Sequence, residues 1–227
     1  MSKVDETEED VKSSSSRLRI TEIFYSLQGE ARSSGYATVF IRLTGCPLRC
    51  EYCDTTYAFK GGEWFSLLDI LTEVKKYNTK YITVTGGEPL AQKQCINLLH
   101  LMCDEGYDVS LETSGALDIS KVDPRVSRVM DLKTPASKEE AKNCYDNIEL
   151  LTAHDQLKFV ICDRNDYEWA VDKINEYDLL SRCEVLFSTS HQQLKPQTLA
   201  DWILEDQLAV RFQMQLHKYL WNDEPGR

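Results

Sequence analysis

The chain has 227 residues, of which 42% are hydrophobic and 28% are charged, values that suit one sizeable globular domain with its own core. Its formal net charge of -11 argues against nucleic-acid binding, since no local basic stripe offsets repulsion by phosphates. No apolar run approaches the roughly 20 residues of a membrane-spanning helix, and the N-terminus lacks a signal-peptide pattern. We therefore expect a cytoplasmic protein that contacts neither nucleic acid nor membranes.

Residues 1–17 differ in composition from the rest, because they are acidic, Ser-rich and nearly devoid of large apolar side chains. Such a segment buries too little apolar surface to offset the entropy cost of ordering it. We predict a disordered, inert tail here. One domain then occupies residues 18–227, where no second linker or internal repeat is visible.

From residue 18 onward, β-rich runs alternate with helical patterns. We predict strands at 38–44, 81–85, 108–113, 127–133, 157–162, 184–189 and 209–216, and helices at 66–77, 92–106, 138–151, 166–178 and 196–206. This alternation implies right-handed βαβ units and an α/β fold with about six or seven mostly parallel strands. An incomplete TIM-like (β/α) barrel and an open doubly wound sheet both fit, and periodicity alone does not separate them.

Three cysteines, Cys46, Cys50 and Cys53, follow the first predicted strand with the spacing C-x3-C-x2-C. Functional residues of α/β folds gather at the carboxyl ends of strands, so we expect a metal site at that edge. A structural zinc ion needs four Cys or His ligands, and a distant fourth ligand such as Cys95 or His217 stays an alternative. On a four-iron cluster, three thiolates leave one iron open for a small molecule.

The triplet, with Tyr52 before its last cysteine, resembles the signature of the radical S-adenosylmethionine (SAM) superfamily. The stretch "TGGEP" (85–89) resembles the superfamily's GGEP motif, whose glycines permit close backbone approach to the bound ammonium group. The resemblance implies the radical SAM fold and a 4Fe-4S cluster on the three cysteines. It also implies an open iron that chelates SAM, and a 5'-deoxyadenosyl radical that abstracts a hydrogen atom.

Further stretches resemble one branch, the 7-carboxy-7-deazaguanine synthase family. They are "EIFYSLQGEARSSG" (22–35, with Ala31 for a usual glycine), "FIRLTGCPLRCEYCDT" (40–55), "VTGGEPL" (84–90), "ETSG" (112–115) and "QLHKYLW" (215–221). The family converts 6-carboxy-5,6,7,8-tetrahydropterin to 7-carboxy-7-deazaguanine with loss of ammonia, in queuosine and 7-deazapurine biosynthesis. The resemblance implies SAM as a reusable cofactor, Mg²⁺, a homodimer and an external electron donor of the flavodoxin type.

The resemblance also implies roles for single residues. Thr55 matches the family's Mg²⁺ ligand, although it would also suit a turn cap. Gln28 and Glu30 suit the guanidine-like edge of a pterin, and a polar turn is the plainer interpretation. Arg42 lies in an apolar strand and needs a carboxylate, either the substrate's own or that of Glu30 or Glu112. The implied substrate-binding residues are Leu27, Gln28, Gly29, Glu30, Arg42, Thr85, Glu112 and His217. The implied cofactor-binding residues are Tyr52, Asp54, Gly86, Gly87, Glu88, Asp131, Lys133, Ser188 and His191.

Two other functions would use the same triplet. A glycyl-radical-enzyme activating enzyme shares the cysteine spacing, but it would leave the "LQGE" segment, Arg42 and Thr55 without a purpose. A non-catalytic iron–sulfur or zinc module would use the cysteines structurally, and its metal content would distinguish it from an enzyme.

Overall fold

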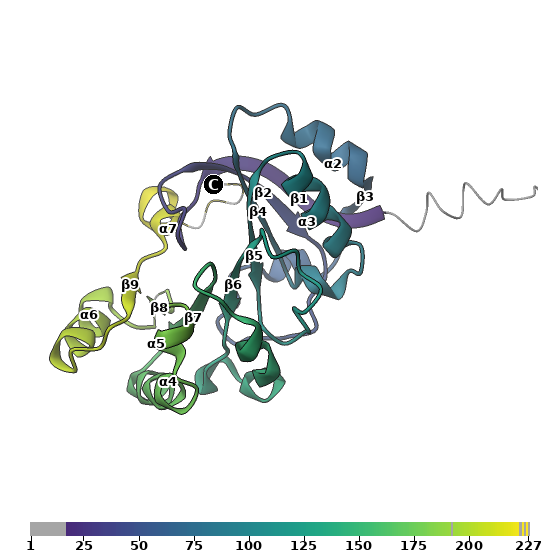
Figure 1. Cartoon of the computed structure of the whole chain (residues 1–227). Helices are drawn as coiled ribbons and strands as arrows, with labels where there is room; N and C mark the ends of the chain where they lie inside the picture. The colour runs from purple at the N-terminus through teal and green to yellow at the C-terminus, as the bar shows by residue number, and fades with distance from the viewer. Residues whose placement is uncertain (1–16, 192, 223, 225, 227) are drawn as a thin grey trace, which may run out of the picture.

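The computed structural model describes residues 17–191, 193–222, 224 and 226. The predicted tail at 1–17 lies outside this part of the chain, except for Arg17, which begins the first strand. Within the described residues, nine strands form one sheet in the order β3-β1-β2-β4-β5-β6-β7-β8-β9 (Figure 1).

The elements have the following bounds. The strands are β1 (Arg17–Leu27), β2 (Ala37–Leu43), β3 (Glu63–Ser66), β4 (Tyr81–Gly86), β5 (Asp108–Thr113), β6 (Ser127–Asp131), β7 (Gln156–Ile161), β8 (Glu184–Thr189) and β9 (Arg211–Gln213). The α-helices are α2 (Leu67–Val74), α3 (Cys95–Asp104), α4 (Arg164–Glu176), α5 (Leu179–Arg182), α6 (Pro196–Glu205) and α7 (Leu216–Trp221). Short 3-10 segments are η1 (Thr56–Phe59), η2 (Pro89–Ala91), η3 (Pro135–Ser137), η4 (Glu140–Lys142) and η5 (Tyr145–Leu150).

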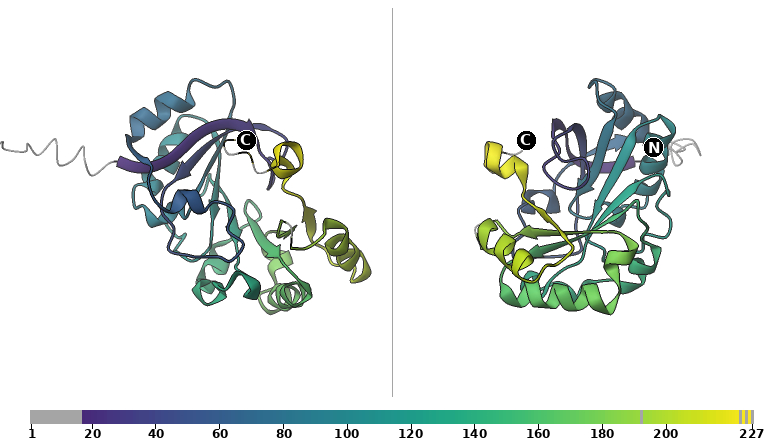
Figure 2. Two further views of the ribbon diagram at one scale, coloured as in Figure 1. Left: turned by 180° about the vertical axis from the view of Figure 1, so that it is seen from behind. Right: turned by 60° about the vertical axis from the view of Figure 1, so that its left-hand side comes forward.

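Seven neighbouring strands, β2 and β4 to β9, run parallel, and their order in space is their order along the chain. A doubly wound sheet would reverse at a switch point, so the one-way order excludes that architecture. Right-handed crossovers then place the connecting helices on one face of the sheet, and they lie along its outer side (Figure 2). The edges β3 and β9 do not pair with each other in the described residues. The predicted α/β fold, an incomplete TIM-like barrel of mostly parallel strands, is confirmed, and the sheet is open.

The strands β1 and β3 were not predicted from the sequence. β1 pairs antiparallel with both β2 and β3, and its register against β2 shifts between Ile20 and Glu22. Leu18 and Ile20 are buried, whereas residues 21–27 are half-buried or exposed. An irregularity of this kind breaks the period-2 alternation that identifies a strand. The hydrophobic pattern therefore does not indicate that residues 17–27 form a strand.

The helix predicted at 138–151 is wrong, because this stretch forms the 3-10 segments η4 and η5. The buried side chain of Asn147 donates to the carbonyl of Gly115 at 3.0 Å and accepts from the amide of Ile119 at 3.2 Å. Side-chain bonds to the backbone compete with the helical pattern. The strand predicted at 209–216 is also too long, since β9 has three residues and α7 begins at Leu216.

The two faces of the sheet differ in polarity. On β4, Ile82 and Val84 are buried in the hydrophobic core against the helices. Thr83 and Thr85 alternate with them and therefore point to the inner face of the sheet. The same alternation in β7 sends Lys158 inward, between buried apolar neighbours. The inner face is thus the polar one, and the core lies on the outer side. Among the described residues, no helix is both long enough and apolar enough to cross a bilayer.

Candidate active site

A cavity of about 420 Å³ opens on the inner side of the sheet, at the carboxyl ends of the parallel strands. Eighteen of the predicted site residues line it: Leu27, Gln28, Glu30, Arg42, Cys46, Cys50, Tyr52, Cys53, Asp54, Thr55, Thr85, Gly86, Gly87, Glu112, Asp131, Lys133, His191 and His217. Gly29, Glu88 and Ser188 are not part of the lining. Residues from both ends of the chain therefore meet in one chamber.

The three cysteines lie on the loop that follows β2, and each thiol is partly buried. The amide of Cys53 donates to the carbonyl of Cys50 at 3.2 Å, which folds the loop into a turn. Burial raises the pKa of all three thiols, that of Cys50 to about 11, so iron binding must displace three protons. The described residues contain no group of three Cys, His, Asp or Glu side chains placed to hold a single metal ion. Three thiolates on different irons of a cluster do not need to converge on one ion.

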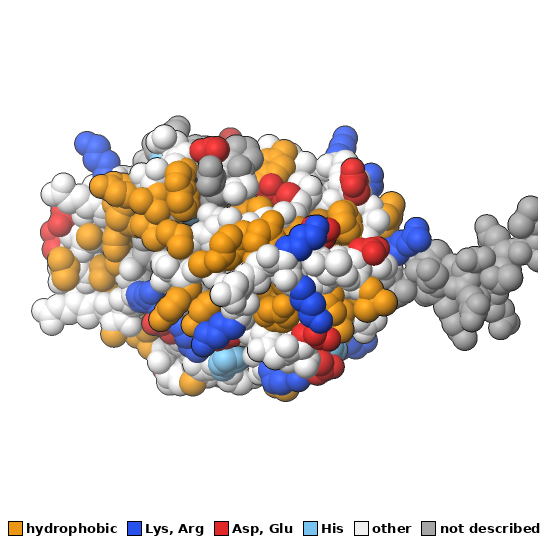
Figure 3. Space-filling model, turned by 90° about the horizontal axis from the view of Figure 1, so that it is seen from above, with side chains coloured by type: hydrophobic (Ala, Val, Ile, Leu, Met, Phe, Trp, Pro, Cys, Tyr) orange, Lys and Arg blue, Asp and Glu red, His pale blue; other side chains and the backbone are white. Residues whose placement is uncertain are grey.

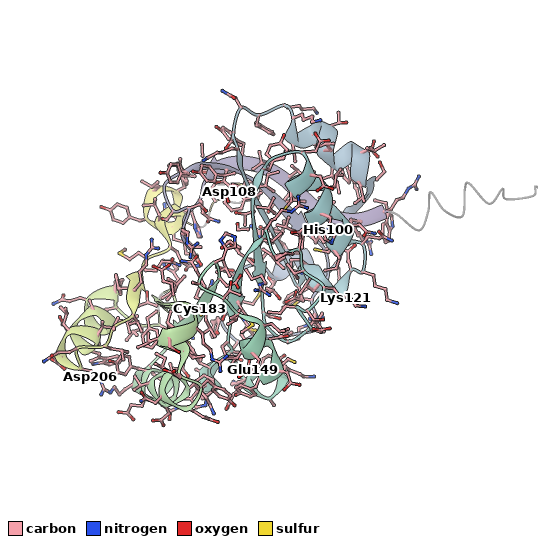
Figure 4. All side chains as sticks on the ribbon, viewed as in Figure 1. His100, Asp108, Lys121, Glu149, Cys183 and Asp206 are labelled. Carbon is pink, nitrogen blue, oxygen red and sulfur yellow. The ribbon has the colours of Figure 1, made fainter. Side chains whose placement is uncertain are left out.

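The other five cysteines are free thiols. None is in a disulfide, and Cys95, Cys103, Cys162 and Cys183 are buried while Cys144 is half-buried. Cys183, just before β8 (Figure 4), is among those outside the cavity lining.

The GGEP stretch packs directly against the cysteine loop. A Cβ atom on Gly87 would lie 2.3 Å from the carbonyl oxygen of Gly45 and 2.8 Å from the Cβ of Cys46. Gly86 has a φ of +157°, and a Cβ there would meet the backbone of Leu43 at 2.3 Å. The two glycines are therefore needed for close approach of the β2 and β4 loops, in addition to any contact with a ligand.

Glu88 is fully buried behind this loop. Its carboxylate accepts hydrogen bonds from the Thr113 hydroxyl at 2.9 Å and from the Ser114 amide at 2.7 Å. Glu88 thus ties the loop after β4 to the loop after β5, and its predicted cofactor contact stays a prediction.

At the opposite wall, polar side chains from β4, β5 and the loop after β1 form one network. Gln28 Nε2 donates to Thr83 Oγ1 at 2.9 Å and to Glu112 Oε1 at 3.3 Å, while Thr85 Oγ1 donates to Glu112 Oε2 at 2.8 Å. The Glu30 amide donates to Gln28 Oε1 at 3.1 Å. The predicted substrate residues are therefore held in one orientation by each other.

Glu30 forms a buried ion pair with a residue that the sequence did not predict. Lys158 Nζ lies 2.7 Å from Glu30 Oε2 and 3.8 Å from Asp131 Oδ2. Gln215 donates to Glu30 Oε1 at 2.7 Å. The sequence could have indicated Lys158 by the argument that applied to Arg42, because a charged side chain in an otherwise apolar strand needs a partner.

Arg42 pairs with neither carboxylate considered from the sequence. Its Nε donates to Glu22 Oε1 at 2.7 Å, on the neighbouring strand β1. Tyr57 donates to the same oxygen at 2.8 Å, and the Arg42 guanidinium lies over the rings of Phe24 and Tyr57 at 5.7 and 5.9 Å. The bond to Glu22 uses Nε, so the terminal nitrogens can bind a ligand carboxylate.

The side of the cavity near the cysteines carries Asp131 and Lys133 at the end of β6. Lys133 Nζ lies 3.0 Å from Asp131 Oδ2 and 5.9 Å from the centre of the Tyr52 ring. Asp131 Oδ1 is buried and has no hydrogen-bond partner within the described part of the chain, so it can accept a hydrogen bond from a ligand. Ser188 is buried within β8, whereas Ser190 and His191 reach the cavity.

The C-terminal helix α7 covers one side of the site (Figure 1). Lys218 Nζ lies 2.7 Å from Asp54 Oδ2, and Thr55 Oγ1 donates to Asp54 Oδ1 at 2.9 Å. Burial acts to raise the pKa of Asp54, but Lys218 and Thr55 hold it well below its usual range. Gly29 lies against the same helix, and a Cβ there would meet His217 Nδ1 at 2.2 Å. Gly29 therefore shapes the site by admitting His217.

Comparison with known proteins agrees with this geometry. Residues 40–177 match the Radical SAM superfamily. The 7-carboxy-7-deazaguanine synthase of Chlorobaculum tepidum is 41% identical over 210 residues, covering 91% of this chain and 96% of that protein. Its namesake from Koribacter versatilis is 40% identical over 222 residues, covering 91% and 98%. The chain belongs to the 7-carboxy-7-deazaguanine synthase family.

Membership establishes a radical SAM enzyme, with a 4Fe-4S cluster and SAM as its cofactors. The crystal structure of QueE from Escherichia coli shares the fold, with a TM-score of 0.73 and 21% identity, covering 93% of this chain and 100% of that one. The cavity fits the cofactors, because three thiols, two close-packed glycines and the open Asp131 oxygen border the same space.

Proposed function

We propose that this enzyme converts 6-carboxy-5,6,7,8-tetrahydropterin to 7-carboxy-7-deazaguanine with loss of ammonia, as part of queuosine and 7-deazapurine biosynthesis. The observation that carries the proposal is one chamber that holds the cysteine triplet at one end and the Gln28, Glu30 and Glu112 network at the other. Carboxylate and amide oxygens accept hydrogen bonds from the N–H groups of a pterin's guanidine-like edge.

The side chains have separate tasks in this proposal. Glu30 and Glu112 bind the pterin edge, Gln28 holds both in register, and Arg42 takes the substrate carboxylate. When bound, the cluster and SAM supply the radical that abstracts a hydrogen atom from the substrate. The protein keeps the substrate close to that radical and excludes water and competing C–H bonds.

We assign Mg²⁺ to Thr55, whose hydroxyl faces the cavity next to Asp54. Mg²⁺ favours oxygen ligands and keeps several positions for water and substrate. Thr55→Ala should raise the Mg²⁺ concentration needed for half-maximal activity by about tenfold or more. Thr56→Ala, which changes the exposed neighbour at the start of η1, is the matched control and should keep the wild-type dependence. An unchanged dependence in Thr55→Ala would place the metal elsewhere.

Product analysis tests the proposed reaction. Anaerobic incubation of the reconstituted enzyme with the carboxypterin, SAM, Mg²⁺ and a reductant should yield 7-carboxy-7-deazaguanine by mass, without stoichiometric consumption of SAM. The enzyme should hold about four irons per chain. SAM consumed in proportion to turnover would favour the activating-enzyme alternative, and zinc in place of iron would favour a binding module.

Two partners complete the proposal. An external donor must supply the electron for the cluster, and we propose a flavodoxin-type protein. We also propose a homodimer. Large apolar residues are exposed, including Tyr36 at 55%, Trp64 at 62% and Tyr219 at 77%, and apolar side chains gather on the face seen in Figure 3. Sedimentation of the purified enzyme should give twice the chain mass, and a monomer at all concentrations would contradict this part.

A further inference from the structure

Lys158 is a charged side chain of the cavity for which the sequence predicted no role. It projects from β7 between Leu157 and Phe159, both fully buried, and is itself 14% exposed. Its ammonium lies 2.7 Å from Glu30 Oε2 and 3.8 Å from Asp131 Oδ2. Because burial of an ammonium group is costly, a purely apolar strand would be the simpler solution for stability alone.

Two uncharged amide side chains also orient the Glu30 carboxylate. Gln215 donates to Oε1 at 2.7 Å, and Gln213 donates to Oε2 at 3.4 Å. His217 faces Glu30 from α7, and Glu112 and Asp131 face Lys158 from β5 and β6. Among the described residues, Lys158 is the cation at ion-pair distance from Glu30.

We propose that Lys158 is a positioning residue that keeps Glu30 ionised and aimed at the substrate, and thereby sets the pH range in which the pterin binds. The inference rests on the proposed function, in which Glu30 accepts hydrogen bonds from the pterin edge. A neutral carboxyl group would present an O–H donor toward substrate N–H donors, and the complementarity would be lost.

The direction of the pKa shifts supports this role. Burial acts to raise the pKa of Glu30, but Lys158, His217 and Gln215 together lower it. Burial acts to lower the pKa of Lys158, whereas Glu30, Asp131 and Glu112 raise it. Both groups stay charged at neutral pH, so Lys158 is no proton carrier there. Without Lys158, burial would dominate and move the pKa of Glu30 upward, toward neutral pH.

The test compares KM for the carboxypterin across about pH 6 to 8.5 in reconstituted full-length enzyme. Wild-type KM should be nearly flat on the acidic side. In Lys158→Met, KM should rise as pH falls, by roughly tenfold or more at the acidic end, because Glu30 becomes protonated. The effect on kcat at saturating substrate should be much smaller. Lys158→Arg, which keeps the charge, should restore most of the wild-type profile.

Two further variants separate this role from a general structural one. Lys158→Met combined with Glu30→Gln removes the titrating group and should give a high but pH-independent KM. Lys173→Met removes a lysine that pairs with Glu176 on α4, outside the cavity, and should keep the wild-type profile. His217 is present in all of these variants, so it does not by itself explain a difference between them.

The outcomes are distinguishable from failure of the proposed function. If wild-type enzyme forms no deazaguanine product, the proposed function is wrong. If product forms but Lys158→Met keeps a flat KM profile, the role of Lys158 is overturned. If Lys158→Met does not fold, the double variant decides, because no lone buried charge remains in it. A pH-dependent KM in the folded double variant would contradict the proposal, and a flat one would support it.

Discussion

At the scale of single residues, contacts between two loops explain why glycine is required at the GGEP stretch. Gly87 has no room for a methyl group, because its nearest neighbours are the backbone of Gly45 and the Cβ of Cys46. Backbone atoms do not move aside as the end of a flexible side chain does. The position of the cysteine loop therefore depends on this glycine as well as on the cysteines themselves.

Gly87→Ala should displace the cysteine loop and lower the iron content after reconstitution to less than half of the wild-type value. Gly106→Ala is the control, since Gly106 has a φ of +86° and no atom within 4 Å of a built Cβ. It should cost about 1 kcal/mol in stability and leave iron content unchanged. Iron and sulfide assays with a denaturation curve measure both effects. Full iron loading of Gly87→Ala would show that the loop can shift without losing the cluster.

At the scale of elements, α7 joins the cysteine loop to the loop after β1. Lys218 binds Asp54, and the Leu216 amide donates to the carbonyl of Gly29 at 3.1 Å. Since α7 has only six residues, a helix of this length is marginal alone in water. Its position is therefore held by these tertiary contacts.

Truncation after Met214 removes Gln215 and the whole of α7, including His217 and Lys218. The cysteine loop and GGEP stretch keep each other's contacts, so iron content and SAM binding should change less than about threefold. Activity should fall by at least about a hundredfold, since one wall of the substrate pocket is lost. Iron assay, SAM titration and product formation measure these separately. A truncated enzyme with near wild-type activity would show that α7 does not shape the pocket.

The sequence patterns predicted the parallel strands well, and they predicted short or irregular elements poorly. All seven parallel strands were predicted, because each lies in a β-rich run of the sequence. The irregular register of β1, the bonds from Asn147 on η5 to Gly115 and Ile119, and the brief helices α5 and α7 were missed. The pairing of β1, the Asn147 bonds and the position of α7 depend on contacts between residues far apart in sequence, which a local periodicity does not contain.

For the site, the motifs identified most of the cavity lining but not its ion pairs. The pairs of Arg42 with Glu22 and of Lys158 with Glu30 join separate strands. A charge in an apolar strand signals that a partner exists, but which carboxylate supplies it depends on strand order and register.

At the scale of the whole molecule, stability against acid depends on a buried ion pair far from the cavity. Arg128 on β6 donates through Nε to Asp155 Oδ1 at 2.9 Å, and the two side chains are 10% and 1% exposed. Burial acts to raise the pKa of Asp155, but the bonds from Arg128 and Thr152 lower it overall. The ionised Asp155 carboxylate therefore stabilises the fold at pH values above the ordinary Asp pKa. This stabilisation is lost as the pH falls through the lowered pKa that Asp155 has in the folded protein.

Arg128→Leu should reduce the free energy of unfolding by about 3 to 5 kcal/mol at pH 7, since Asp155 would remain buried without its cation. The deficit should shrink toward pH 4, where Asp155 of the variant becomes protonated. Lys76→Met, which breaks an exposed pair with Glu73 on the surface, should cost less than about 1 kcal/mol at either pH. Urea denaturation at the two pH values measures all of these. A pH-independent deficit in Arg128→Leu would attribute its effect to packing.

Because α7 packs against the β1–β2 region, the cavity joins segments that the ribosome synthesises at different times. Strands β1, β2 and β4 emerge early and bring the three cysteines and the GGEP stretch together. The side chains of Gln215 and His217 reach the same cavity only after β5 to β9 have been synthesised. The residues that would hold the iron are therefore synthesised before the residues of α7 that close the substrate side of the chamber.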